Sequence, residues 1–413
     1  MSTVAARGAP GTLTPGAMAA EETRPTDRRV RSIDIIRGAV MVLMAIDHVR
    51  VFAGVPPGGP DYGVFFTRWV THFCAPAFLF LAGTSAFLHG SRPGRSTSEL
   101  SRFLLARGAW LVLLELTVLR LAWTFNADFA SYNLAGVIWV IGWCMILMAA
   151  LVHLPLRVVG AIGLAIVLGH NVLDHVPGLA ATARESALAP LWSVLYFGGP
   201  VEIADGGTRL VVLYSLVPWI GVMAAGYAFG PVVRMEPERR RRICLRVGLG
   251  ATGAFLVLRL LDVHGDPVSW REGTSWLPAA LSFLNTTKYP ASLLFLLMTL
   301  GPTIALIPLL DRARGWITDA LVVFGRVPFF YYVLHIPLIH AVAAVISLVR
   351  YGEVVPWLFG NHPMEPPPVP EGYAYGLPML YLVTTAVVVA LYVPCRWFAR
   401  LRERRRDAWL SYL

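Results

Sequence analysis

The sequence predicts an all-α fold, a polytopic membrane bundle of about ten transmembrane helices. Apolar residues make up 56% of the 413 residues and charged residues only 15%, whereas an ordinary soluble domain carries about 25% charged residues. The mean hydropathy is +0.61. Several apolar runs exceed the ~18 residues that mark a membrane-spanning helix. These observations exclude a soluble enzyme, a disordered protein and a disulfide-rich secreted scaffold. The continuous runs also argue against a transmembrane barrel, whose strands alternate.

Ten apolar segments follow one another along the chain, and we expect one helix from each. They cover approximately residues 33–53, 68–89, 103–123, 134–152, 156–173, 209–230, 244–264, 289–310, 327–349 and 375–398. A shorter amphipathic stretch, Trp316 to Phe324, precedes the ninth segment and is expected to lie at the membrane surface.

The ends of the chain differ from the apolar middle. Residues 1–29 are rich in Ala, Gly, Pro, Thr and charge and lack the apolar stretch of a signal peptide. We predict a disordered cytoplasmic tail over 1–29, a transmembrane domain over 30–400 and a basic cytoplasmic tail over 401–413.

The basic residues predict the orientation. Of the 35 basic residues, 25 fall in the two tails and in every second loop, which places that side in the cytoplasm. Both termini are therefore expected to be cytoplasmic, in a multi-pass protein of the cell (inner) membrane. The same distribution explains the net charge of +10 without a nucleic-acid partner. The lipid bilayer is the expected partner, and a homo-oligomer is left open.

Ionisable residues inside a membrane are costly and point to a function. The first segment contains Asp34, Arg37, Asp47 and His48. Arg37 and His48 are eleven residues apart, which is nearly three helical turns, so both project from one face about 16 Å apart. Asp34 is close enough to pair with Arg37. An ion pair that fixes the helix end is the plain alternative for those two residues.

The second segment contains another basic pair, Arg68 and His72, whose i, i+4 spacing puts both on one helical face. Pro76 is expected to open the backbone there. Later in the chain, Asn285, Lys288 and Tyr289 lead into the eighth segment. Lys288 is the only lysine in the protein.

The ninth segment is expected to begin at Arg326 and to contain His335 on the same face as Tyr331. No metal site is predicted, because the four cysteines are far apart and show no CxxC spacing. No GxxxxGK[ST], HExxH or GxSxG motif occurs, which argues against an ATP-driven pump and a zincin-type protease.

The first two segments resemble integral-membrane acyltransferases, and among them the bacterial relatives of heparan-alpha-glucosaminide N-acetyltransferase. The resemblance rests on the run Arg31-Ser32-Ile33-Asp34-Ile35-Ile36-Arg37-Gly38 with Met44-Ala45-Ile46-Asp47-His48, on Thr67-Arg68-Trp69 with the run from His72 to Gly83, on Asn285 to Pro290, and on Gly325 to His335. It implies a helical bundle that moves acetyl groups from cytoplasmic acetyl-CoA to a glycan or amino-sugar acceptor.

The resemblance also suggests roles for individual residues. Related O-antigen and peptidoglycan acyltransferases have a similar Arg-Gly and a histidine eleven residues after the arginine, the position of His48. The lysosomal enzyme has Asn at that position and an acidic residue where His72 stands.

Acyl transfer needs a base or a nucleophile, and we expect His48 to fill this role. Asp47 is expected to orient His48 or to stabilise its imidazolium. We expect His72 and Arg68 to polarise the thioester carbonyl or to hold the acceptor.

Binding of the two substrates is assigned to other residues. Arg37 and Arg326 are expected to meet the phosphates of acetyl-CoA or to line a pore to them, because the arginine fork suits phosphate. Asp34, the expected partner of Arg37, is assigned to the same cofactor-binding set. The expected acceptor-binding residues are Asn285, Lys288, Tyr289 and His335.

Two other classes of protein remain as alternatives. Membrane Asp, His and Arg residues also suit a transporter of protons, sugars or lipid-linked intermediates, although no inverted repeat is evident. A non-catalytic membrane scaffold does not explain the ionisable residues. Binding of acetyl-CoA separates the acyltransferase from both.

Overall fold

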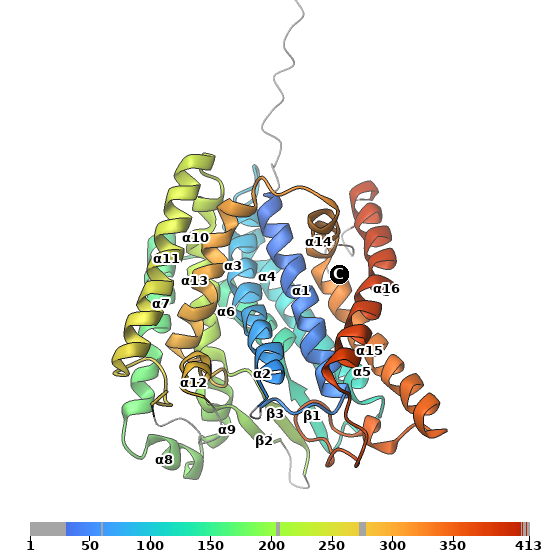
Figure 1. Ribbon diagram of the computed structural model, residues 1–413. Helices are drawn as coiled ribbons and strands as arrows, with labels where there is room; N and C mark the ends of the chain where they lie inside the picture. The colour runs from blue at the N-terminus through green and yellow to red at the C-terminus, as the bar shows by residue number, and fades with distance from the viewer. Residues whose placement is uncertain are drawn as a thin grey trace, which may run out of the picture. The chain divides into compact units, whose positions relative to one another are not determined.

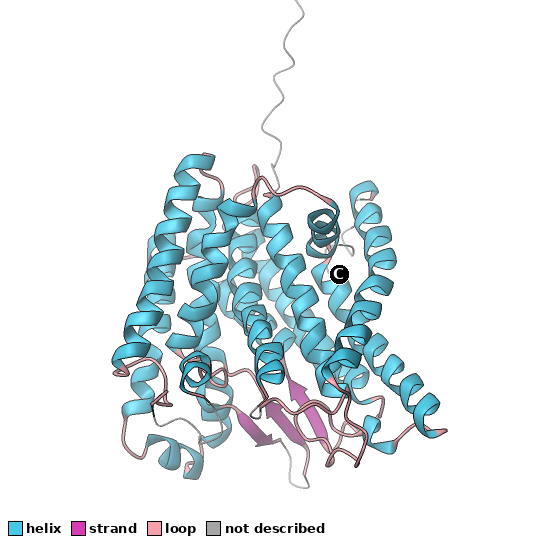
Figure 2. Cartoon of the chain, viewed as in Figure 1, coloured by secondary structure: helices cyan, strands magenta, loops and turns pink. Residues whose placement is uncertain are grey.

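The computed structural model describes residues 30–58, 61–203, 207–271 and 278–405, together with 407 and 410. The predicted tail over 1–29 lies outside these residues, as does most of 406–413. The unit Arg31–Leu413 is mainly helical in its described part (Figure 2). The prediction of an all-α membrane bundle is therefore confirmed.

Each of the ten predicted segments contains a helix. The ten helical segments are α1 (Arg31–Phe52), α2 with α3 (Tyr62–Trp69 and Cys74–Gly90), α4 with α5 (Thr97–Leu114 and Arg120–Thr124), α6 (Val137–Leu151), α7 (Leu156–Gly169), α10 (Leu216–Val233), α11 (Pro237–Leu261), α13 (Leu293–Leu310), α15 (Pro328–Tyr351) and α16 (Leu377–Arg404). Within the described chain, seven of them are long and apolar enough to cross a membrane. The other three are α1, which contains five charged residues, α4 with α5, and α6, which has only 15 residues. The protein is a multi-pass membrane protein.

The remaining elements are short. They are β1 (Tyr132–Ala135), α8 (Leu179–Glu185), α9 (Ala189–Trp192), β2 (Gly199–Glu202), β3 (Arg209–Val212), α12 (Ala279–Leu284) and α14 (Trp316–Arg326). The amphipathic stretch before the ninth segment forms α14, and its location at the membrane surface stays a prediction.

The structure contains a three-stranded sheet that was not expected from the sequence. Its order is β1-β3-β2, with β3 parallel to β1 and antiparallel to β2. Residues 209–212 were expected to begin a transmembrane helix, but they form β3, and α10 starts only at Leu216. The branched side chains of Val211 and Val212 suit a strand, and both are buried in the sheet.

The long helices run side by side, and the sheet lies at one end of them, which we call the sheet end (Figure 1). α1 begins at the opposite end and reaches the sheet end with its last turn. Helices α3 and α10 pack closely. The approach is possible because Gly83 has no Cβ atom, which would otherwise lie 2.0 Å from the carbonyl oxygen of Met223. Small residues of this kind let membrane helices approach through their backbones.

The second segment is interrupted by a 3-10 turn, Val70–Phe73, between α2 and α3. Pro76 explains the interruption, because proline offers no N–H to the carbonyl of His72 and its ring clashes there. Arg68 belongs to α2 and His72 to the 3-10 turn. The two residues therefore do not belong to one continuous α-helix, and a 3-10 turn has about three residues per turn rather than the 3.6 on which the predicted shared face depends.

The start of the ninth helix also differs from the prediction. Arg326 ends α14 rather than beginning α15, and α15 starts at Pro328. Proline is favoured in the first turn of a helix and disfavours helical geometry in the residue before it. Val327, between the two helices, has a ψ of 50° and is not helical. α16 runs on to Arg404, past the predicted boundary at residue 400.

Candidate active site

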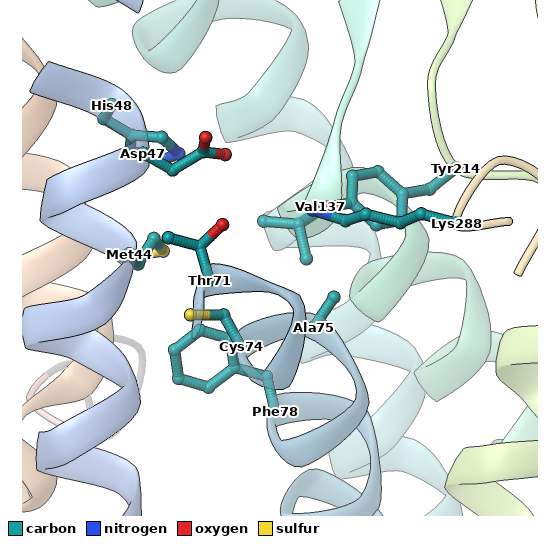
Figure 3. Close-up of a pocket in the computed structure, with 10 residues that line it drawn as sticks. All are labelled: Met44, Asp47, His48, Thr71, Cys74, Ala75, Phe78, Val137, Tyr214 and Lys288. Atoms are coloured by element: carbon teal, nitrogen blue, oxygen red, sulfur yellow. The ribbon is translucent and has the colours of Figure 1, made fainter. Parts of the chain in front are cut away.

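A small cavity lies where α1, α3, α6 and two loops meet (Figure 3). It is lined by Met44, Asp47, His48, Thr71, Cys74, Ala75, Phe78, Val137, Tyr214 and Lys288. Its volume is about 30 Å³, enough for roughly two water molecules. Segments that are far apart in the sequence thus bring their polar side chains to one small cavity.

The polar groups stand on opposite walls of the cavity. Asp47 and His48 reach it from α1, whereas Tyr214 and Lys288 reach it from the other side (Figure 3). Lys288 is only 9% exposed. An acid–base side chain and an ammonium group therefore face the same space.

His48 is held by another histidine. Its Nδ1 lies 2.7 Å from Nε2 of His335 in α15, and the two ring planes are inclined by 22° with centroids 4.8 Å apart. Nδ1 of His335 lies 2.6 Å from the carbonyl oxygen of Tyr332. The rings of Trp123 and His48 meet edge to face, with centroids 4.8 Å apart. Within the described chain, Nε2 of His48 has no hydrogen-bond partner.

The carboxylate of Asp47 pairs with Arg50 and not with His48, the partner expected from the sequence. Its Oδ1 accepts a hydrogen bond of 2.9 Å from Nε of Arg50. Nη1 of Arg50 donates to the carbonyl oxygen of Val55. Arg50 follows Asp47 by three residues, and this i, i+3 spacing was the signal that could have identified it. The imidazole of His48 is hydrogen-bonded to His335 and not to Asp47.

Lys288 enters the cavity beside two tyrosines. Its Nζ lies 5.1 Å from the ring centroid of Tyr289, within the range of a cation–π interaction. The hydroxyl of Tyr289 donates to that of Tyr214 over 3.4 Å. Of these three residues, Lys288 and Tyr214 line the cavity.

The loop before Lys288 is fixed by a buried arginine, Arg259 of α11. Its guanidinium donates to the carbonyl oxygens of Ser282, Phe283 and Asn285. Asn285, an expected acceptor-binding residue, is thus held through its backbone and does not line the cavity.

The structure does not bring Arg68 and His72 into the cavity wall. Arg68 is half-buried, its backbone carbonyl accepts a hydrogen bond from Oγ1 of Thr71, and its guanidinium makes no hydrogen bond or ion pair with the described residues. His72 is 3% exposed, its ring packs against Phe295 at 5.4 Å, and neither ring nitrogen has a hydrogen-bond partner.

The residues expected to meet acetyl-CoA lie together at the N-terminal end of α1. Arg37 lies 3.5 Å from the carboxylate of Asp34, so the predicted ion pair is present. Arg37 also donates to the carbonyl of Gly325 and to Oγ of Ser85, at 3.1 and 2.9 Å. Arg326, next to Gly325, pairs with Glu403. Both arginines already have partners within the protein.

Several lining residues were not singled out as site residues in the sequence. Cys74 and Ala75 belong to a quoted motif, whereas Val137 and Tyr214 lie within apolar segments, where nothing in the sequence distinguishes them from packing residues. Among the described residues, no cluster of three or more His, Cys, Asp or Glu side chains suits a metal ion.

A loop packs against the end of α1 near the site. His362, between α15 and α16, is fully buried, and its Nε2 lies 3.0 Å from the carbonyl oxygen of Trp357. Its ring lies 5.2 Å from that of Phe52. Burial lowers the pKa of His362 to about 4.

The fold and the site define a membrane-embedded protein with a small, partly open cavity lined by acid–base side chains. Residues 29–258 match the family model for heparan-alpha-glucosaminide N-acetyltransferase, catalytic. Because the match covers more than half of the chain, the protein belongs to this family of membrane acetyltransferases. No curated protein matches the chain. Lys288 and His335 lie after the matched residues.

Proposed function

We propose that the protein transfers an acetyl or other short acyl group from acetyl-CoA to an amine or hydroxyl of a glycan or amino sugar. One observation carries the proposal: a partnered histidine, His48, and a buried ammonium, Lys288, face each other across one small cavity. Membership of an acetyltransferase family supports the type of reaction.

His48 is the general base of this proposal. Nε2 of His48 takes the proton from the acceptor N–H or O–H as the acceptor attacks the thioester carbonyl. A C–N or C–O bond forms and the C–S bond breaks. The proton on Nε2 then passes to the departing thiolate, so the products are the acylated acceptor and CoA-SH.

Lys288 stabilises the oxygen of the thioester carbonyl in our proposal. Negative charge develops on that oxygen during the attack, and a positive donor in an enclosed site stabilises it more strongly than water does. Lys288 is suited to this because it lines the cavity opposite His48 and no described carboxylate pairs with it.

The donor fits the site only in part. A cavity of about 30 Å³ suits an acetyl group, and the nucleotide of acetyl-CoA has to stay outside. The arm of CoA spans about 15–20 Å, close to the rise of about 16 Å between Arg37 and His48. We therefore propose that the nucleotide binds near Arg37 and Arg326, with both termini and this end of the bundle in the cytoplasm.

The test combines binding with turnover. Acetyl-CoA is titrated by calorimetry into the purified protein in detergent, and acetyl transfer to glucosamine is followed by mass spectrometry. We expect wild type and His48→Gln to bind acetyl-CoA alike. Transfer is expected to fall about 10²–10⁴-fold in the variant, the usual contribution of a general base.

The matched control is His153→Gln, since His153 is an exposed histidine in the loop between α6 and α7. This variant should behave as wild type in both assays. Absence of saturable acetyl-CoA binding by the wild type would overturn the proposal and favour a transporter. Full transfer by His48→Gln would remove His48 from the mechanism.

A further inference from the structure

The contact between His48 and His335 joins α1 to α15 beside the cavity. His335 is fully buried, its ring stacks on that of Tyr331 with centroids 5.3 Å apart, and it meets the ring of Tyr332 edge to face with centroids 5.1 Å apart. The two histidine rings are inclined by only 22°. His335 is therefore held on several sides and has little freedom to turn.

The contacts of His335 determine which of its nitrogens carries the proton. A carbonyl oxygen only accepts hydrogen bonds, so Nδ1 of His335, 2.6 Å from the oxygen of Tyr332, has to be the donor. In a neutral imidazole the other nitrogen then carries a lone pair. Nε2 of His335 is consequently an acceptor toward His48.

The position of the proton on His48 follows from that on His335. Since Nε2 of His335 accepts, the proton in the 2.7 Å contact belongs to Nδ1 of His48. The neutral ring of His48 then has its lone pair on Nε2, the nitrogen without a partner in the described chain. If Nε2 of His335 donated to His48 instead, a neutral His335 would place the lone pair of its Nδ1 against the carbonyl oxygen of Tyr332. Avoiding this would require a second proton on a fully buried ring.

We propose that His335 is a positioning residue, which holds His48 in the Nδ1–H tautomer so that Nε2 is the basic atom. This inference rests on the proposed function and changes the expected role of His335 from acceptor binding to orientation of the base. The nitrogen that bears the proton in a histidine is set by the hydrogen bond of the other nitrogen. Without His335, the ring of His48 can exchange between its two neutral forms.

During transfer the pair keeps its order. The acceptor proton moves to Nε2 of His48, so His48 becomes an imidazolium that donates from Nδ1 to the neutral His335. The same proton then leaves Nε2 for the thiolate of CoA. His48 returns to the Nδ1–H tautomer and His335 exchanges no proton.

The experiment reads the tautomer directly. The protein is labelled with ¹⁵N-histidine, and the imidazole ¹⁵N shifts report which nitrogen is protonated; the signals of His48 are those that disappear in His48→Gln. We expect the Nδ1–H form in the wild type, a mixture of both forms in His335→Phe, and restoration of Nδ1–H in His335→Gln, whose amide oxygen can accept.

The matched control is His340→Phe. His340 lies in the same helix, is equally buried, and places its Nδ1 3.1 Å from the carbonyl oxygen of Ala122. This variant removes a comparable contact and should leave His48 in the Nδ1–H form. If His335→Phe does not fold, the shifts of His335→Gln and of the wild type still decide the question.

An Nε2–H form of His48 in the wild type, or an unchanged tautomer in folded His335→Phe, would overturn the inference. The shifts need neither acetyl-CoA nor an acceptor, so the result stands even if the proposed reaction is wrong. In the transfer assay, His335→Phe should lower kcat about 10-fold or more with little change in KM for acetyl-CoA, and His335→Gln should recover part of it.

Discussion

A Cβ atom at Gly38 in α1 would lie 1.9 Å from the carbonyl oxygen of Leu321 in α14. The relationship is reciprocal, because a Cβ atom at Gly325 of α14 would lie 1.9 Å from the carbonyl oxygen of Asp34. The two helices therefore touch through their backbones. This contact lies beside Arg37, which donates to the carbonyl of Gly325, and it fixes the end of α1 that we assign to acetyl-CoA.

The first prediction concerns this contact. Gly38→Ala should destabilise the protein by about 1–3 kcal/mol, because the added methyl group meets backbone atoms that cannot rotate away. Thermal unfolding in detergent measures the effect. Gly250→Ala in α11 is the control, since a Cβ atom there meets nothing within 4 Å. Equal melting temperatures for the two variants would contradict the close contact.

The second prediction concerns Lys288. Lys288→Met should lower kcat for acetyl transfer by about 10²–10³-fold, as removal of an oxyanion donor does, while KM for acetyl-CoA changes little. Lys288→Arg should retain part of the activity, because it keeps the charge. Steady-state kinetics with acetyl-CoA and glucosamine measure both variants. A folded Lys288→Met with wild-type kcat would exclude the proposed role.

The third prediction separates binding from structure at Arg37. Arg37→Gln should weaken acetyl-CoA binding about tenfold, roughly 1.4 kcal/mol, and should also lower the melting temperature, since it loses its bonds to Ser85 and Gly325. Calorimetry and thermal unfolding measure the two effects. Arg209→Gln, an exposed arginine at the sheet end, makes the same charge change and should affect neither strongly. A lower melting temperature with unchanged affinity would leave Arg37 a purely structural role.

The fourth prediction concerns pH and His362. Its pKa is about 4 in the folded protein against an ordinary value of 6.5. Between these values the unfolded chain binds a proton that the folded protein does not, so stability is complete above pH 6.5 and falls toward pH 4. The loss should reach about 3 kcal/mol. Unfolding measured from pH 4 to 7.5 should depend less steeply on pH in His362→Gln, and identical slopes would refute the assignment.

Much of the fold could be predicted because each long helix coincides with one continuous apolar run. Pro76 also indicated a disturbance in the second segment, and the structure has a 3-10 turn just before it. The sheet could not be predicted in the same way. Its strands have only four residues each, and β1 and β3 adjoin apolar helices, so their periodicity is hidden in the longer runs.

Several residues of the candidate site could be identified from the sequence, but the contacts between them could not. His48 could be identified because it is an ionisable residue in an apolar segment. Lys288 could be identified because it is the only lysine in the sequence. The contact between His48 and His335 joins helices at opposite ends of the chain, and no spacing in the sequence connects them. The i, i+3 spacing of Asp47 and Arg50 can be seen in the sequence, but Asp47 is also adjacent to His48. The sequence alone therefore did not show which of the two residues binds Asp47.

The pairing of β1 with β3 has a consequence for synthesis of the protein. β1 lies before α6 and β3 after α9, and the two strands are parallel with Tyr132 opposite Arg209. A growing chain therefore exposes the edge of β1 while α6 and α7 are made and inserted, and the edge is covered only when β3 emerges. Unpaired strand edges invite wrong pairing during folding. The sheet can therefore form only after the ribosome has synthesised β3, when α6 and α7 have already been made.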